Sequence, residues 1–226
     1  MTLLQNVLAI TYKDMKQMRK LLLFGNGLLL VYGVLLAFLN EVDKGLILVA
    51  MIMVISVVGF ATRSAMVEEQ RWRFLYSLPL TKSHIALGKY AAILAATLLY
   101  LISATLGLVI QAFMVGSTTG LAISIWVLAG FAGTGLLFAG AALAVALRWG
   151  VRAAMYLQYV PLVLFFFGGI PAFKQLAHRV GEVVLTTWQA VNPSPAAVAT
   201  VVVIAILAIY LLQADIAARL LESREV

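Results

Sequence analysis

The side chains that could support catalysis or bind a metal ion are few in this sequence and do not form a known motif. The two histidines, His84 and His178, stand in separate polar segments with long apolar runs between them. Neither belongs to a His-Glu-x-x-His pattern, no Gly-x-Ser-x-Gly occurs, and the chain has no cysteine. We therefore expect this chain to have no catalytic site, no metal centre and no cofactor of its own.

A nucleotide-binding loop is also missing from the sequence. The pattern Gly-x-x-x-x-Gly-Lys-Ser/Thr would cradle the phosphates of ATP. Gly88-Lys89 lacks the earlier glycine and is followed by Tyr90. The sequence predicts that this chain is not an enzyme, and that another chain hydrolyses ATP if ATP is used.

The composition indicates a membrane protein. Of the 226 residues, 64% are hydrophobic and 11% are charged, and the mean hydropathy is +1.05. A soluble domain of this size could not bury so much apolar surface. A helix needs about 20 apolar residues to cross the hydrocarbon core, and six runs come close to this length. They predict an all-α membrane protein with one transmembrane domain over residues 1–226 and spans at 21–39, 45–62, 90–114, 121–147, 156–172 and 196–212.

The interiors of these six runs contain no Asp, Glu, Lys, Arg or His. Ion-driven transporters usually place ionisable groups at membrane depth, so secondary transport is disfavoured. Weaker polar groups in the spans, such as Asn26 and Ser103, are expected to form hydrogen bonds between helices. The run 121–147 has repeated small-x-x-x-small pairs, which predict close packing against neighbouring helices.

The distribution of basic residues predicts the orientation of the spans. Of the 16 Lys and Arg residues, 13 fall in the N-terminal segment, the second and fourth connections and the C-terminal tail. The remaining connections hold only Lys44, Lys174 and Arg179. Since positive charge marks the cytoplasmic side, we expect both termini to be cytoplasmic. The bases lie in short segments between apolar runs, so they indicate topology and not binding to nucleic acid.

Two amphipathic segments accompany the spans. If residues 1–20 form a helix, its mostly apolar residues fall on one face: Leu3, Leu4, Val7, Leu8, Thr11, Met15 and Met18. Their polar residues fall elsewhere, namely Lys13, Asp14, Lys16, Gln17 and Lys20. This pattern predicts an interfacial helix on the inner membrane surface, and a simple surface anchor is the alternative. Residues 173–190 predict an extracytoplasmic helical element, either re-entrant or surface-lying, unless the preceding glycines and proline only kink a normal span.

The longest polar stretch, residues 63–89, separates the second and third spans. Glu68 and Glu69 favour the first turn of a short helix, Pro79 ends that helix, and Thr81 is a suitable N-cap for the next one. A short helix with several aromatic side chains and both signs of charge predicts a docking surface for a cytoplasmic partner. Its residues are Glu68, Glu69, Arg71, Trp72, Leu75, Tyr76, Leu78 and Pro79. The alternative is a solvated loop anchored at the membrane interface by Trp72.

This stretch resembles the ABC-2 type permeases, the membrane subunits of ATP-binding-cassette exporters. The resemblance rests on Glu68-Glu69, on the run Leu-x-Ser-Leu-Pro-Leu-Thr-Lys at 75–82, and on Leu-Gly-Lys-Tyr at 87–90. In that family the helix in this loop is the coupling helix, seated in a groove of the ATPase. By position, the acidic pair opens the coupling helix and residues 77–79 close it. Many relatives have a glycine soon after the acidic residue, where this chain has the sequence Gln-Arg-Trp-Arg at 70–73.

The resemblance implies a permease dimer, with itself or a paralogue, bound to separate ATPase subunits that hold ATP and Mg²⁺. The resemblance also implies a location in a bacterial-type plasma (inner) membrane. Within the family, the chain looks most like the small permeases that export amphipathic or antimicrobial peptides. Two other readings stay open from the residues alone. One is a membrane scaffold that recruits a partner through residues 66–80 without transporting anything, and the other is a secondary transporter.

Overall fold

The computed structural model describes residues 3–35, 42–69, 81–116, 121–156, 159 and 195–222. Within these ranges the chain is helical, and no strand occurs. The long helices are α1 (Leu3–Gln17), α2 (Arg19–Leu35), α3 (Val42–Glu69), α5 (Lys82–Val115), α6 (Leu121–Trp149) and α9 (Pro195–Glu222). The predicted all-α fold is confirmed for this part of the chain.

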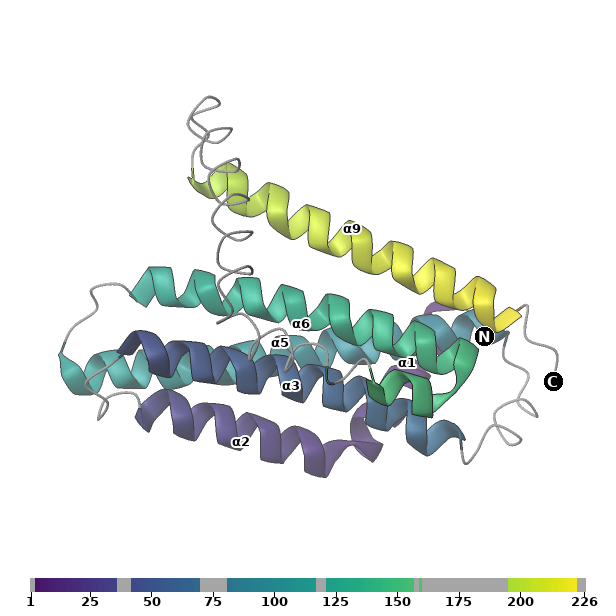
Figure 1. The fold of residues 1–226 in the computed structure, drawn as a ribbon, viewed down its shortest axis with the longest axis horizontal. Helices are drawn as coiled ribbons and strands as arrows, with labels where there is room; N and C mark the ends of the chain where they lie inside the picture. Colours follow the sequence, from purple (N-terminus) through teal and green to yellow (C-terminus); the bar gives the residue numbers. More distant parts are fainter. Residues whose placement is uncertain are drawn as a thin grey trace.

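The helices α2, α3, α5 and α6 lie side by side, and successive helices of this bundle run in opposite directions (Figure 1). The helix α9 packs on α5 and α6 through its C-terminal half and diverges from them toward its N-terminal end (Figure 1). The helix α1 packs mainly on α5. As a result, α1, the end of α3, the start of α5 and the end of α9 share one end of the bundle.

We call this end, on the right in Figure 1, the basic end. The Lys and Arg residues whose side chains the structure describes all belong to it: Lys13, Lys16, Arg19, Lys20, Arg63, Lys89, Arg148, Arg152 and Arg219. The helix directions therefore agree with the charge asymmetry that the sequence predicts.

Among the described residues, four helical stretches are long and apolar enough to cross a membrane, namely Leu46–Val67, Ser83–Val115, Ser124–Trp149 and Thr200–Glu222. The helices α1 and α2 meet at 68°, and this bent pair would make a fifth span. The predicted span at 156–172 and the predicted outer helix at 173–190 lie outside the described residues, apart from Tyr156 and Tyr159. A total of six spans stays a prediction.

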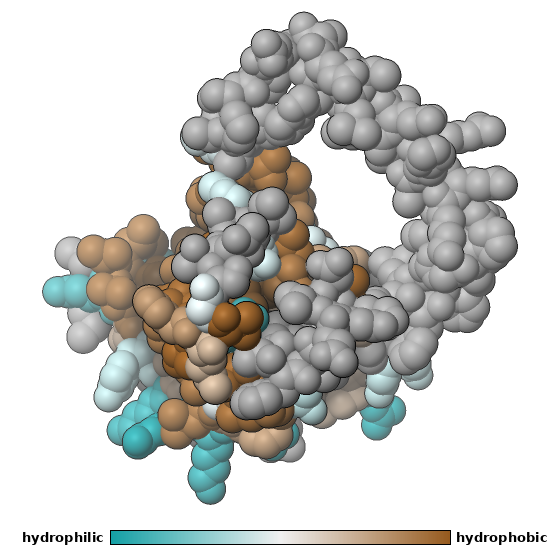
Figure 2. Space-filling view, turned by 90° about the vertical axis from the view of Figure 1, so that its left-hand side faces the viewer, coloured by the Kyte–Doolittle hydropathy of each residue, from teal (hydrophilic) through white to brown (hydrophobic). Residues whose placement is uncertain are grey.

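The outside of the bundle is apolar. On α5, for example, Leu98, Ile102 and Leu106 are each about half exposed. Figure 2 views the bundle from the end opposite the basic end, and brown, hydrophobic residues cover most of the surface that is not grey. Such a surface is suited to contact with lipid tails and would be unfavourable in water.

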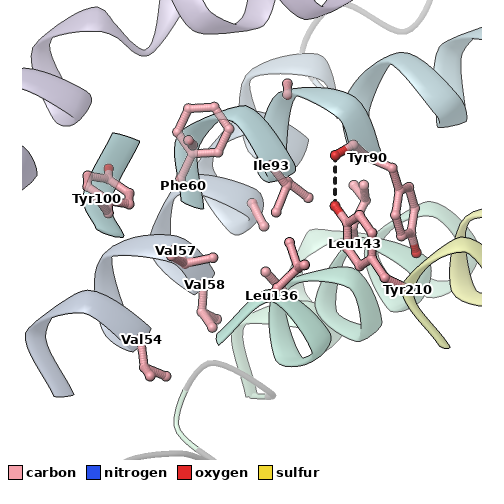
Figure 3. Close-up of a cluster of buried hydrophobic side chains, with 14 of the residues drawn as sticks. Val54, Val57, Val58, Phe60, Tyr90, Ile93, Tyr100, Leu136, Leu143 and Tyr210 are labelled. Carbon is pink, nitrogen blue, oxygen red and sulfur yellow. Dashed lines mark hydrogen bonds between the residues drawn. The ribbon is translucent and has the colours of Figure 1, made fainter. Parts of the chain in front are cut away.

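The core lies where α3, α5 and α6 meet, with Phe60, Ile93 and Leu136 among its labelled side chains (Figure 3). Small residues of α6 allow the neighbouring helices to approach closely. A Cβ atom at Gly135 would lie 3.3 Å from the Cα of Val54 on α3. The predicted close packing of 121–147 is therefore confirmed.

A polar contact between spans is also present as the sequence predicts. The Ser103 hydroxyl of α5 donates to the Asn26 side-chain oxygen of α2 at 2.7 Å, and the Asn26 amide donates to the Leu22 carbonyl at 2.8 Å. Interhelical bonds of this kind are worth about 1 kcal/mol in a membrane. The bond between Ser103 and Asn26 fixes the register of α2 against α5.

Candidate functional site at the start of α5

The predicted docking segment lies between α3 and α5. Glu68 and Glu69 are the last residues of α3, which is one continuous helix because no glycine or proline interrupts residues 60–69. The acidic pair therefore ends α3 and does not begin a separate helix. The other predicted docking residues lie outside the described residues: Arg71, Trp72, Leu75, Tyr76, Leu78 and Pro79. Their role stays a prediction, but the structure describes what holds both ends of the segment.

Thr81 caps the N-terminus of α5, as the sequence predicts. Its backbone is extended, with φ −71° and ψ 149°, and its hydroxyl accepts a hydrogen bond from the backbone N–H of His84. A Ser or Thr cap stabilises a helix by about 1 kcal/mol. The cap gives α5 a fixed starting point directly after the predicted docking segment.

The helix α1 packs along the first turns of α5. The Asn6 amide nitrogen lies 3.4 Å from Nδ1 of His84, and the Thr11 hydroxyl donates to the Gly88 carbonyl at 3.1 Å. Gly88 permits this approach because a Cβ atom there would lie 2.6 Å from the Cβ of Ile10. The two helices are therefore held at a distance that only glycine allows at position 88.

A buried ion pair next to this contact joins three helices. Lys89 Nζ of α5 lies 3.2 Å from Oδ2 of Asp14 on α1 and donates to the Ser64 hydroxyl of α3 at 3.0 Å. The Ser64 hydroxyl donates to the same Asp14 oxygen at 3.1 Å. The side chains of Lys89 and Asp14 are only 1% and 2% exposed. Burying a charge is costly unless it is paired, so Lys89 and Asp14 stabilise each other in this buried position, and the Ser64 hydroxyl adds a hydrogen bond to each.

Tyr90 extends the connections to α6 and α9. Its hydroxyl donates to the Gly140 carbonyl of α6 at 2.7 Å, and its own carbonyl accepts from the Tyr210 hydroxyl of α9 at 2.7 Å (Figure 3). The ring centroids of Tyr90 and Tyr210 are 5.1 Å apart at an interplanar angle of 54°. This tilted arrangement is favourable for two aromatic rings and adds apolar contact to the hydrogen bonds.

Gly88, Lys89 and Tyr90 are consecutive, yet together they contact α1, α3, α6 and α9. We call these residues, with Asp14 and Ser64, the hub. Its polar groups contact one another, the backbone and Lys13, so the hub holds these helices together. Gly88, Lys89 and Tyr90 follow the predicted docking segment within the first turns of α5, and Ser64 precedes that segment on α3.

The sequence pattern does not predict this role for two of the hub residues. In the sequence, Lys89 is one more base of a polar connection, and Asp14 falls on the polar side of residues 1–20. The structure shows both side chains to be buried and paired. The pattern of one helix does not reveal which neighbour covers each face, so the partner could not be identified. The available signal was a Gly-Lys pair directly before an apolar run.

Long apolar helices with bases at one end and polar contacts buried between them define a multi-pass helical membrane protein. The sequence matches the family model described as ABC-2 family transporter protein over residues 9–222, and the chain belongs to that family. The predicted resemblance to the ABC-2 type permeases is confirmed. No curated protein and no solved structure matches the chain.

Proposed function

We propose that the chain is the permease subunit of an ATP-binding-cassette exporter and that a separate subunit binds ATP and Mg²⁺ and hydrolyses the ATP. Membership of the ABC-2 transporter family supports this role. The sequence has no nucleotide-binding loop, which agrees with a permease chain that relies on a separate subunit for ATP hydrolysis.

One observation carries the proposal: the two helices that flank the docking segment are joined by one buried network. Ser64 of α3 precedes the segment, Lys89 of α5 follows it, and both bind Asp14 of α1. A partner acting on residues 70–80 would therefore move α1, α3 and α5 together, and through Tyr90 it would also act on α6 and α9. Tightly packed elements with defined polar contacts transmit such displacements because they are not continuously deformable.

We further propose that residues 68–79 dock into a groove of the ATPase on the cytoplasmic side of the plasma membrane. The bases at the basic end support a cytoplasmic location for that end. In this proposal two permease chains, identical or paralogous, form the transport unit. The resemblance to small exporter permeases favours amphipathic or antimicrobial peptides as the substrate.

The proposal is tested by co-expressing the tagged chain with the ATP-binding-cassette subunit of the same genome and purifying both in a membrane environment. We expect the two subunits to co-purify, the complex to hydrolyse ATP and the isolated chain to hydrolyse none. Hydrolysis by the isolated chain would contradict the proposal. A stable chain that never binds an ATPase subunit would favour the scaffold function instead.

A further inference from the structure

We propose that the bend between α1 and α2 forms a binding site for the phosphate-bearing headgroup of an anionic phospholipid. A cavity of about 500 Å³ opens at this bend. Its lining comes from α1, α2, the residue between them and α3: Lys16, Gln17, Met18, Arg19, Lys20, Leu21, Phe24 and Arg63. The volume is within the range of small-molecule sites in proteins.

The positive charge of this cavity favours an anionic ligand. Three bases, Lys16, Arg19 and Lys20, come from the bend, and α3 supplies Arg63 across from it. Within the described ranges, no carboxylate pairs with any of these four side chains, whereas Lys89 and Lys13 both approach Asp14. Four like charges around one cavity repel one another, and a bound phosphate would relieve the repulsion and accept several hydrogen bonds.

The apolar part of the lining indicates a lipid and not a free anion. Phe24 is 69% exposed and lies about one turn beyond Lys20 on α2, where the chain enters its apolar run. Leu21 and the buried Met18 extend this apolar surface to the bases. A ligand that fits both parts carries a negative headgroup and an adjoining acyl chain. Basic pockets at the ends of membrane helices bind anionic lipid headgroups through such contacts.

The bend also brings the site close to the hub. The backbone N–H of Met18 donates to the Asp14 carbonyl at 2.9 Å, and the N–H of Leu22 donates to the Met18 carbonyl at 2.9 Å. The hydrogen-bond chain therefore continues through the 68° bend. A lipid bound on the bend would stabilise the angle at which α1 reaches Lys89.

The test measures retention of lipids by the purified full chain, which does not depend on transport or on the ATPase. The chain is reconstituted with equal amounts of phosphatidylglycerol and phosphatidylcholine, and bound lipids are counted by native mass spectrometry during titration. We expect phosphatidylglycerol to be retained in preference to phosphatidylcholine. The double variant Arg19→Gln/Arg63→Gln should weaken phosphatidylglycerol binding about thirtyfold, since each base near the surface contributes roughly one factor of five.

The matched control is Arg148→Gln/Arg152→Gln, which removes two exposed arginines from the same end of the bundle outside the cavity. This control should bind phosphatidylglycerol like the unaltered chain. If both double variants lose binding equally, only general attraction to the basic end remains and the site is disproved. Equal retention of the two lipids would also overturn the proposal.

A competition experiment with phosphate and a second cavity variant complete the test. Inorganic phosphate should not displace the lipid at millimolar concentration, and displacement would identify a free-anion site instead. If the Arg19/Arg63 variant fails to fold, Lys16→Gln/Lys20→Gln replaces it, because both side chains are exposed. Unchanged lipid binding by a folded cavity variant would contradict the proposal.

Discussion

Lys89 of α5 lies 3.2 Å from Asp14 of α1, and the two side chains are only 1% and 2% exposed. This pair ties the N-terminal helix to the first turns after the predicted docking segment. Ser64 brings α3, which precedes the segment, into the same network. The helix α1 therefore contacts, through Asp14, both helices that flank the predicted docking segment.

The first prediction concerns the cost of breaking this pair. Lys89→Met or Asp14→Leu alone removes one side of the buried ion pair, and a change of this kind typically costs about 3–5 kcal/mol of folding free energy. In Lys89→Met the half-exposed Lys13, 3.6 Å from the other Asp14 oxygen, still offsets part of this cost. The double variant Asp14→Leu/Lys89→Met should recover most of the lost stability, since apolar replacements of both partners are often close to neutral. Unfolding of the purified chain in detergent measures these differences.

The exposed pair of Asp215 and Arg219 is the matched control. Their side chains are 53% and 77% exposed, and the Arg219 Nε lies 2.9 Å from the carboxylate. Asp215→Asn should cost at most about 1 kcal/mol, because exposed ion pairs contribute little. If Lys89→Met is as mild as this control, the buried network does not hold the helices together.

A second prediction concerns the close approach at Gly88. A Cβ atom at this position would lie 2.6 Å from the Cβ of Ile10, so Gly88→Ala should destabilise the chain by about 1–3 kcal/mol. Gly27→Ala is the control, since nothing lies within 4 Å of a Cβ there. That change should be neutral or stabilising by up to about 1 kcal/mol. Adding Ile10→Ala to Gly88→Ala should restore part of the loss, and absence of any restoration would count against the packing of α1 on Gly88.

The sequence predicts helices more reliably than it predicts contacts between them. Apolar runs locate α3, α5, α6 and α9, but α3 continues to Glu69 and α5 begins at Lys82, beyond the predicted spans. Helical hydrogen bonding does not stop where the lipid ends, so hydropathy cannot give these boundaries. The Thr81 cap is local and was predictable. The pairing of Asp14 with Lys89 joins residues far apart in the chain, and no local pattern specifies it.

The third prediction concerns topology. The chain has no cysteine, so single cysteines can be introduced without background. A cysteine at Ser117 or Gln189 should react with a membrane-impermeant thiol reagent in intact cells, because both positions are predicted to be extracytoplasmic. A cysteine at Ser83, in the first turn of α5 at the basic end, should react only after the membrane is opened. The reverse pattern of labelling would contradict the predicted orientation of the chain in the membrane.

The most direct test of the central claim is the affinity of the purified chain for its ATPase subunit. Trp72→Ala/Tyr76→Ala should weaken this association by at least about thirtyfold, because the loss of even one buried aromatic anchor typically costs about 2 kcal/mol or more. The amount of folded chain in the membrane should not change, since neither residue lies in a predicted span. If the double variant binds the ATPase with normal affinity and supports normal coupled transport, residues 68–79 are not the docking segment.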